Sequence, residues 1–345
     1  MLLKATTKAR RYEESQRTFR VFVASWLHFS VSSACSACSA FKRRIFYTFS
    51  RSVGSTIALA AALAVFSLAP ASAAGQAAPG QAGGCPNDSA HFHPCAMAKA
   101  KAFKPPMGPD GHPDLQGLWD APTVPGGQSI EEHRGEYGFG ATNSKIVDPA
   151  NGKVPYQPWA AAQRKENPDH YIDPYAFCFP TGVPRQMYNA GSRRIIQLPD
   201  TVTILSERGH LSRIVLMDGR PHVGADVKLW MGDSRGHWEG DTLVVDVTNL
   251  NGRPWFDLLG HFGSDALHVV ERLTLVDANT IDYEATIEDP KVYTKPWKLA
   301  LPLVRNQEYD EIWEEGCHEG ISITPTISNL RSLGYKFYPG TTPPK

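Results

Sequence analysis

The side chains best suited to acid and base chemistry lie in two alternating segments between residues 267 and 288. His268, Arg272 and Glu284 are expected to face one another across adjacent strands. There His268 and Glu284 could act as general acid and base, while Arg272 holds a substrate carboxylate or phosphate. The alternative is a set of cross-strand ion pairs on a solvated face, where the same residue types are common.

Glu271 is the fourth candidate for catalysis, and it is anomalous. It lies in the row of Leu267, Val269 and Leu273, on the apolar face of the expected strand. A buried carboxylate must be paired or neutral, because an isolated buried charge costs too much free energy. A nearby arginine would satisfy it, and Arg213 and Arg194 are the expected partners.

A second group of candidates surrounds the expected hairpin turn at residues 238–242. The residues Trp238, Glu239 and Asp241 flank Gly240, a pattern typical of a turn. At the mouth of a barrel the carboxylates, with Asp233, could act as acid and base or bind a cation. The candidate ligand-binding residues are Arg220, His222, Trp238, Glu239, Asp241, Tyr283 and Trp297.

Histidines beside the expected turns suggest a divalent metal site. Zinc or copper prefers three or four convergent ligands, and His222, His261 and His268 form one conceivable set. His91 and His93, in an expected mobile loop, could bind copper or nickel. Histidines that are solvated or hydrogen-bonded are the alternative in both places, and no HExxH spacing is present.

Several other classes of function have no support in the sequence. There is no Gly-x-Ser-x-Gly motif of a serine hydrolase, and no glycine-rich phosphate loop that would predict a nucleotide cofactor. The 35 basic and 35 acidic residues balance. Nucleic acid is therefore not an expected partner, because such binding requires a basic face.

The elements that would position these residues are β-strands, because β-branched residues alternate with polar ones beyond residue 190. Short turns rich in Gly, Asn and Asp separate the strands. The pattern predicts a mostly β fold, an antiparallel meander closing into a lipocalin-like barrel or a strongly curled sheet; a two-sheet sandwich is the alternative. The expected strands are 193–198, 201–207, 211–217, 227–231, 236–239, 242–248, 267–276, 280–288, 297–304 and 309–313.

The rest of the chain is organised around this core. Basic residues, an apolar run of about a dozen residues and a small-residue cleavage site ending at Ala73 indicate a signal peptide, too short to remain as a membrane span. A periplasmic or secreted location follows from export. The expected parts are a leader at 1–73 with its signal core at 53–73, a disordered linker at 74–84, an irregular Pro/Gly-rich arm at 85–190 with one short helix at 158–165, the β core at 191–320 and a C-terminal tail at 321–345.

Four cysteines follow the leader, and an even number in an exported protein indicates disulfides. They allow three pairings. Cys85 with Cys95 would close a short local loop, which leaves Cys178 with Cys317 as a long-range bridge, and this is the favoured pairing.

The block GDSRGHWEGDTLVV at residues 232–245 resembles a large family of exported, mostly uncharacterised bacterial proteins. The similarity extends over nearly all of the chain that follows the leader, and it suits the pairing of the two cysteines in its recurring blocks. It implies no particular reaction. The other matching blocks are CFPTGVPR at 178–185, DGRPH at 218–222, EDP at 288–290, YTKPW at 293–297 and CHEG at 317–320.

Three hypotheses about function remain open from the sequence. The first is a small-molecule-binding barrel whose cavity is lined by aromatic and charged residues. The second is an exported lyase, isomerase or hydrolase with a His and carboxylate pair in that cavity. The third is a structural partner in the cell envelope. Convergence of His268, Arg272 and a carboxylate in one cavity would favour the enzyme.

Overall fold

The computed structural model describes residues 81–122, 129–134, 141–317 and 323–343. The leader, its signal core and most of the expected linker lie outside the described residues. So does the part of the CHEG block that follows Cys317.

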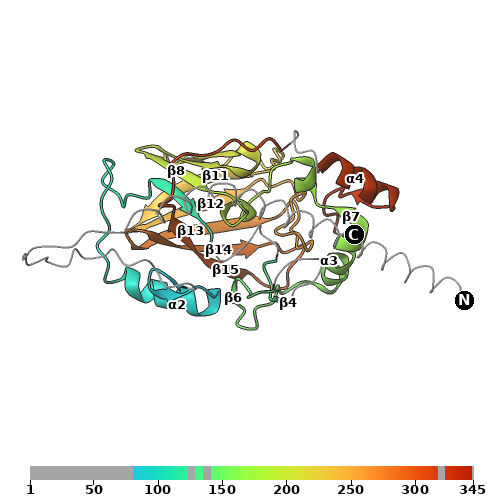
Figure 1. Ribbon diagram of the computed structural model, residues 1–345, viewed down its shortest axis with the longest axis horizontal. Helices are drawn as coiled ribbons and strands as arrows, with labels where there is room; N and C mark the ends of the chain where they lie inside the picture. Colours follow the sequence, from blue (N-terminus) through green and yellow to red (C-terminus); the bar gives the residue numbers. More distant parts are fainter. Residues whose placement is uncertain (1–80, 123–128, 135–140, 318–322, 344–345) are drawn as a thin grey trace, which may run out of the picture. The chain divides into compact units, whose positions relative to one another are not determined.

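Nine strands form the closed ring that dominates the described chain (Figure 1). Short turns at Pro199–Asp200, Gly240–Asp241 and Ala278–Asn279 join consecutive strands, as their residue types predict. The ring contains β3 (Gly117–Asp120), β8 (Arg193–Leu198), β9 (Thr201–Ser206), β10 (Ser212–Leu216), β11 (Asp233–Glu239), β12 (Thr242–Thr248), β13 (His268–Asp277), β14 (Thr280–Glu288) and β15 (Trp297–Arg305).

The ring closes because β3 from the arm inserts between β8 and β15, and β15 also pairs with β14. Neighbouring strands are antiparallel except β10 and β11, which are parallel. The short strand β6 (Ile146–Asp148) pairs with β15 outside the ring. The expected mostly β barrel is therefore confirmed, with a mixed ring in place of a purely antiparallel meander.

Two of the expected strands were wrong. Residues 227–231 belong to the crossover that carries the chain from β10 to its parallel neighbour β11, where Leu229 makes only an isolated bridge to Leu250. A parallel connection cannot be a tight hairpin, so this segment runs outside the ladder despite its alternating sequence. Residues 309–313 form no strand, and Tyr309 and Trp313 instead contact each other as rings.

Alternation within the strands separates an apolar interior from a polar exterior. On β14, Ile281, Tyr283, Ala285 and Ile287 are fully buried and belong to one large apolar cluster. On β13, the face expected to be apolar is buried, including Glu271. Burying these side chains contributes roughly 1.5–3 kcal/mol each relative to exposure, so one face of every strand is committed to the interior.

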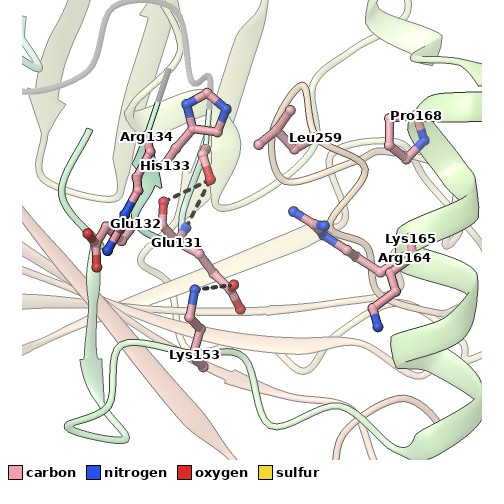
Figure 2. Close-up of a pocket in the computed structure, with 10 residues that line it drawn as sticks. Glu131, Glu132, His133, Arg134, Lys153, Arg164, Lys165, Pro168 and Leu259 are labelled. Atoms are coloured by element: carbon pink, nitrogen blue, oxygen red, sulfur yellow. Dashed lines mark hydrogen bonds and ion pairs between the residues drawn. The ribbon is translucent and has the colours of Figure 1, made fainter. Parts of the chain in front are cut away.

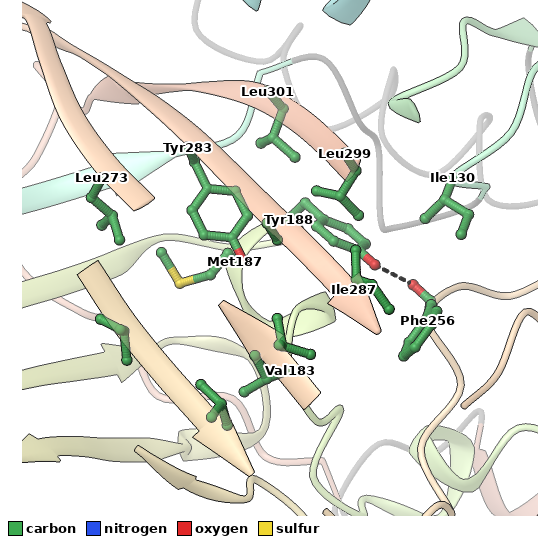
Figure 3. Close-up of a cluster of buried hydrophobic side chains, with 14 of the residues drawn as sticks. Ile130, Val183, Met187, Tyr188, Phe256, Leu273, Tyr283, Ile287, Leu299 and Leu301 are labelled. Atoms are coloured by element: carbon green, nitrogen blue, oxygen red, sulfur yellow. Dashed lines mark hydrogen bonds between the residues drawn. The ribbon is translucent and has the colours of Figure 1, made fainter. Parts of the chain in front are cut away.

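The arm also contributes side chains to this interior. Residues 181–189 precede β8, and Val183, Met187 and Tyr188 pack in the same cluster as the inward side chains of β13, β14 and β15 (Figure 3). Gly182, at a φ of +71°, begins this segment, and a Cβ there would lie 2.7 Å from Pro254. Only glycine permits that backbone and that approach. The interior is therefore filled largely by the protein's own side chains.

Helices flank the barrel. The expected helix at 158–165 is present as α3 (Pro158–His170), and it continues past Asn167–Pro168, where the sequence predicted its end. The described chain also contains α2 (Ser89–Ala100) and α4 (Ile323–Ser332), which were not predicted. Helix α2 lies against the outer face of β13 to β15 (Figure 1). His91 and His93 therefore lie on a helix and not in a mobile loop, because Asp88 caps α2 and Phe92 anchors it.

Both expected disulfides are confirmed, with Cα–Cα distances of 5.9 Å. The short disulfide, Cys85–Cys95, ties α2 to the preceding hairpin of β1 (Gln81–Ala82) and β2 (Cys85–Pro86). The long disulfide, Cys178–Cys317, joins the arm to the segment beyond the barrel. The remaining short strands pair as β4 (His133–Arg134) with β5 (Ala141–Thr142), and β7 (Tyr171–Ile172) with β16 (Lys336–Phe337).

Candidate functional site

The structure does not bring the four expected catalytic residues together. Glu271 points into the barrel, where both its oxygens bind the Arg213 guanidinium and Tyr283 Oη donates to it at 2.6 Å. Of the two arginines expected to pair with Glu271, Arg213 is therefore the partner. Glu271 is 1 % exposed and both its oxygens have partners, so its contacts satisfy buried polar groups inside the barrel.

The other three candidates lie on the opposite face of the same strands. Arg272 pairs with Glu239 at 2.7 Å, and both side chains are substantially exposed. Glu284 is held by His93 of α2 at 3.1 Å and by Lys298 at 3.0 Å. The pairs of Arg272 with Glu239 and of Lys298 with Glu284 are cross-strand ion pairs, as in the alternative interpretation, whereas the contact of His93 from α2 was not expected.

Two of the three expected metal-ligating histidines lie close together. The Asp246 carboxylate lies 2.9 Å from Nε2 of His222 and 3.0 Å from Nε2 of His268, and Nδ1 of His222 lies 2.8 Å from Asp233. His261 lies elsewhere, buried beside Asp257. Within the described ranges, no three His, Cys, Asp or Glu side chains are placed to hold a metal ion together.

The expected ligand-binding residues are similarly dispersed. Trp238 stacks on His112 with ring centroids 4.8 Å apart, and Asp241 is exposed in its turn. Trp297 is completely buried in the apolar cluster, as is Tyr283. Arg220 forms an exposed pair with Asp218 on the β10–β11 crossover. None of these side chains lines any of the three pockets considered below.

A cleft of about 530 Å³ lies outside the barrel (Figure 2). One side, here called the β4 wall, is residues 129–134. The facing side, the α3 wall, presents Arg164, Lys165 and Pro168, while Lys153 and Leu259 complete the lining. Figure 2 shows the Arg164 side chain extending from α3 toward the centre of the cleft.

A buried ionic arrangement anchors the β4 wall. His261 Nδ1 lies 2.6 Å from Asp257 Oδ2, which also accepts the backbone N–H of Ile130 at 2.9 Å. His261 Nε2 faces Glu131 Oε1 at 3.7 Å and has no hydrogen-bond partner among the described residues. Glu131 in turn accepts the Val154 N–H at 2.8 Å. The wall is therefore attached to the loop at 257–261 through charged groups.

The pKa values of this arrangement are strongly shifted. Burial opposes ionisation of Asp257 and Glu131, but His261 and hydrogen bonding prevail and lower the pKa of each carboxyl to about 2. Burial disfavours the imidazolium of His261, but the Asp257 carboxylate raises its pKa. These shifts all favour the state in which the His261 imidazolium lies between the carboxylates of Asp257 and Glu131.

Lys145 is a second buried anchor of the same wall. Its ammonium group donates to the carbonyl oxygen of Ser129, and its backbone N–H donates to that of Ile130 at 2.9 Å. Burial lowers the pKa of Lys145 to about 8, and the Asp257 carboxylate partly opposes the shift. A charged lysine inside the protein indicates that the position of this wall is specified at some cost in stability.

The α3 wall is fixed by helix formation and by one buried amide. Pro158 occupies the first turn, where a missing N–H costs nothing, and an alanine-rich stretch follows. Asn167 donates to the Gly260 carbonyl at 2.9 Å and so ties α3 to the loop that carries His261. Arg164 is half-buried, and its Nε is shielded from solvent without a hydrogen-bond partner in the described chain.

Two smaller pockets are also described, with volumes of about 490 and 230 Å³. The larger of these lies between the start of α3 and residues 288–296, and its charged lining residues are Glu288, Asp289 and Lys295. Asp289 is already engaged by Ser264. The 530 Å³ cleft is larger and has more charged lining residues, so it is the stronger candidate for a ligand site.

Sequence reasoning missed this cleft, although two signals were present. Glu131, Glu132 and Arg134 form a charged run inside an otherwise Pro/Gly-rich arm. Asp257 and His261 have the i,i+4 spacing that lets a carboxylate orient an imidazole, but they lie in an irregular loop.

What this arrangement can do chemically is bind a polar molecule. Cationic and anionic groups line an open cleft, and buried ion pairs fix one wall in position.

None of the described helices is long and apolar enough to cross a membrane. Compared with models of protein families, with curated proteins and with solved structures, the chain matches none of them.

Proposed function

We propose that this chain is an exported protein that binds a small molecule, and that the ligand occupies the cleft between the β4 wall and the α3 wall, not the barrel interior. The cleft carries the proposal, because it is a preformed concave site with fixed polar groups. The inward side chains of the strands form a packed apolar cluster and line none of the three pockets above. The one member of this cluster that lines a pocket is Tyr293, which lies between β14 and β15.

Export is part of the same proposal. It rests on the signal-like segment at 53–73, on the resemblance to exported proteins, and on the two disulfides, which persist in oxidising compartments. A periplasmic or secreted location fits these features. Fractionation of cells expressing the full chain tests it: the protein should be recovered outside the cytoplasm, shortened near Ala73, and retention at full length in the cytoplasm would contradict it.

The binding site is tested by adding bulk to the cleft. Leu259→Trp places an indole among the lining residues, and Thr294→Trp places one in the 490 Å³ pocket as the matched control. Each protein is screened by thermal shift against neutral, cationic and anionic small metabolites. We expect a ligand that stabilises the wild type and Thr294→Trp but not Leu259→Trp.

Two results would contradict the proposed site. One is a ligand that stabilises all three proteins equally, and the other is a screen in which no compound stabilises the wild type. Circular dichroism and the unliganded melting temperature show whether Leu259→Trp has folded. Hydrogen exchange provides an independent readout, because a ligand in the cleft should slow exchange in residues 129–134 and 158–170.

A further inference from the structure

The charges around the cleft indicate the chemistry of its ligand, and this inference rests on the function proposed above. The lining contains four cationic side chains, from Arg134, Lys153, Arg164 and Lys165, and two anionic ones, from Glu131 and Glu132. The whole chain, by contrast, has no net charge. The cleft is therefore a local concentration of positive charge in an otherwise balanced protein.

The acidic residue at the centre of the β4 wall is already committed. Glu131 Oε2 pairs with Lys153 at 3.0 Å, and its other oxygen accepts the Val154 N–H and faces His261. These contacts neutralise Lys153 and leave Glu131 little capacity for a cationic ligand. Glu132 remains, on an exposed side chain.

The other three cations of the lining, Arg134 on the β4 wall and Arg164 and Lys165 on the α3 wall, are not committed. No side-chain hydrogen bond or ion pair joins Arg134, Arg164 or Lys165 to any other residue that the structure describes. Arg164 is the most constrained of them, because its Nε is buried without a partner while the side chain extends into the cleft (Figure 2). A shielded guanidinium donor that lacks an acceptor costs free energy, which an acceptor on a ligand would recover.

We infer that the cleft binds a small molecule bearing an oxyanion, either a carboxylate or a phosphate, and that Arg164 is the residue that recognises it. The planar guanidinium presents paired N–H donors that match the two oxygens of such a group. Lys165 and Arg134 add positive charge at the rim, where they contribute less because solvent and salt screen them.

The test uses three probes and two matched variants. Succinate and inorganic phosphate represent the two sources of an oxyanion, and succinamide has the shape of succinate without its charges. Binding to the full exported protein is measured by calorimetry in a low-salt buffer free of both anions. Arg164→Gln removes the proposed recognition group, and Arg220→Gln removes an arginine of the β10–β11 crossover for the same change in net charge.

We expect succinate or phosphate to bind and succinamide not to bind. Arg164→Gln should weaken the binding about 10- to 100-fold, the effect of losing a hydrogen bond to a charged group. Arg220→Gln should change it less than about twofold, and Lys165→Gln, on an exposed side chain, should have a smaller effect than Arg164→Gln. Added salt should weaken binding of the anion to the wild type.

Several outcomes would overturn the inference. They are equal binding of succinate and succinamide, binding of neither anion, and equal losses in Arg164→Gln and Arg220→Gln. Failure of the inference is distinct from failure of the proposed function. A neutral or cationic ligand that Leu259→Trp excludes would keep the cleft as the binding site and remove only the oxyanion.

Discussion

The buried pair of Arg213 and Glu271 offers the sharpest test of the barrel interior. Glu271→Gln keeps the shape of the side chain and an acceptor for the Tyr283 hydroxyl, but it leaves the Arg213 guanidinium, 3 % exposed, without a counter-charge. Removing one partner of a buried ion pair costs about 3–5 kcal/mol. Because the Tyr283 hydrogen bond can persist, we expect a loss near the lower limit, about 3 kcal/mol.

The assay is urea unfolding followed by tryptophan fluorescence, with both disulfides intact. The double variant Arg213→Met/Glu271→Gln removes both charges, and it should recover most of the lost stability because paired removal of buried charges is often nearly neutral. Glu239→Gln provides the surface control. Its partner Arg272 is exposed, so the expected loss is much smaller than that of Glu271→Gln.

The same variants separate a structural role for Glu271 from a functional one. If Glu271 only satisfies Arg213, Glu271→Gln should bind any cleft ligand as the wild type does at temperatures where both are folded. A loss of stability below about 1 kcal/mol, or a double variant less stable than Glu271→Gln alone, would refute the argument that Glu271 balances a buried charge on Arg213.

Three further predictions concern groups outside the cleft lining. A hydrogen bond to Asp282 raises the pKa of His93 to about 9. The stabilisation that the His93 imidazolium provides is therefore complete below its unfolded pKa of about 6.5, and it is lost as pH rises through 9. Urea unfolding from pH 6.5 to 9.5 should show this decline in the wild type and a flatter profile in His93→Gln. Replacing the cysteines of the long disulfide by serine should cost about 5 kcal/mol of stability by chain entropy, because 139 residues separate them. The same replacement at the short disulfide, with a separation of 10 residues, should cost about 3 kcal/mol. Thermal unfolding should therefore show a larger loss for the long disulfide. Burial lowers the pKa of Lys145 from 10.5 to about 8. The free energy of unfolding of the wild type should therefore rise by up to about 3 kcal/mol between pH 8 and 10.5 relative to that of Lys145→Met. Parallel stability profiles of the two proteins would contradict this.

The strands could be predicted because their signal is local. From β8 to β15 each strand carries its own alternation and ends in its own turn residues, so eight of the ten expected strands are present. The sequence predicted that the sheet closes or curls strongly, but not which strands close the ring. Strand β3 has four residues in the Pro/Gly-rich arm, and its partners in β8 and β15 lie far along the chain. No local pattern specifies such pairing.

Local alternation also misleads where tertiary structure overrides it. Val227 and Leu229 alternate with polar residues as in a strand, but both are about 40 % exposed on the β10–β11 crossover. Asn249, at a φ of +61°, holds this segment by donating to the carbonyls of Gly224 and Val227. The connection between two parallel strands therefore decides the structure of these residues more than their β propensity does.

The candidate site was harder to predict, because its parts come from separate segments of irregular sequence. His261 was named only as a possible metal ligand. Its partners are Asp257 in the same loop and Glu131, which lies 130 residues earlier. Nothing local in the sequence places Glu131 opposite that loop. The expected cavity inside the barrel directed attention to strand residues, while the arm provides most of the cleft.

The contribution of the arm to the interior is the reason why we place the proposed ligand site outside the ring. Residues 181–189 supply Val183, Met187 and Tyr188 to the space that a lipocalin-like barrel would leave for a ligand, and Tyr188 Oη donates to the Phe256 carbonyl at 2.8 Å. Stability is thus concentrated in the packed ring, whereas the exposed cations of the cleft contribute little to it. Variants such as Lys165→Gln should therefore alter ligand binding without unfolding the protein, a separation that a ligand cavity inside the barrel would not allow.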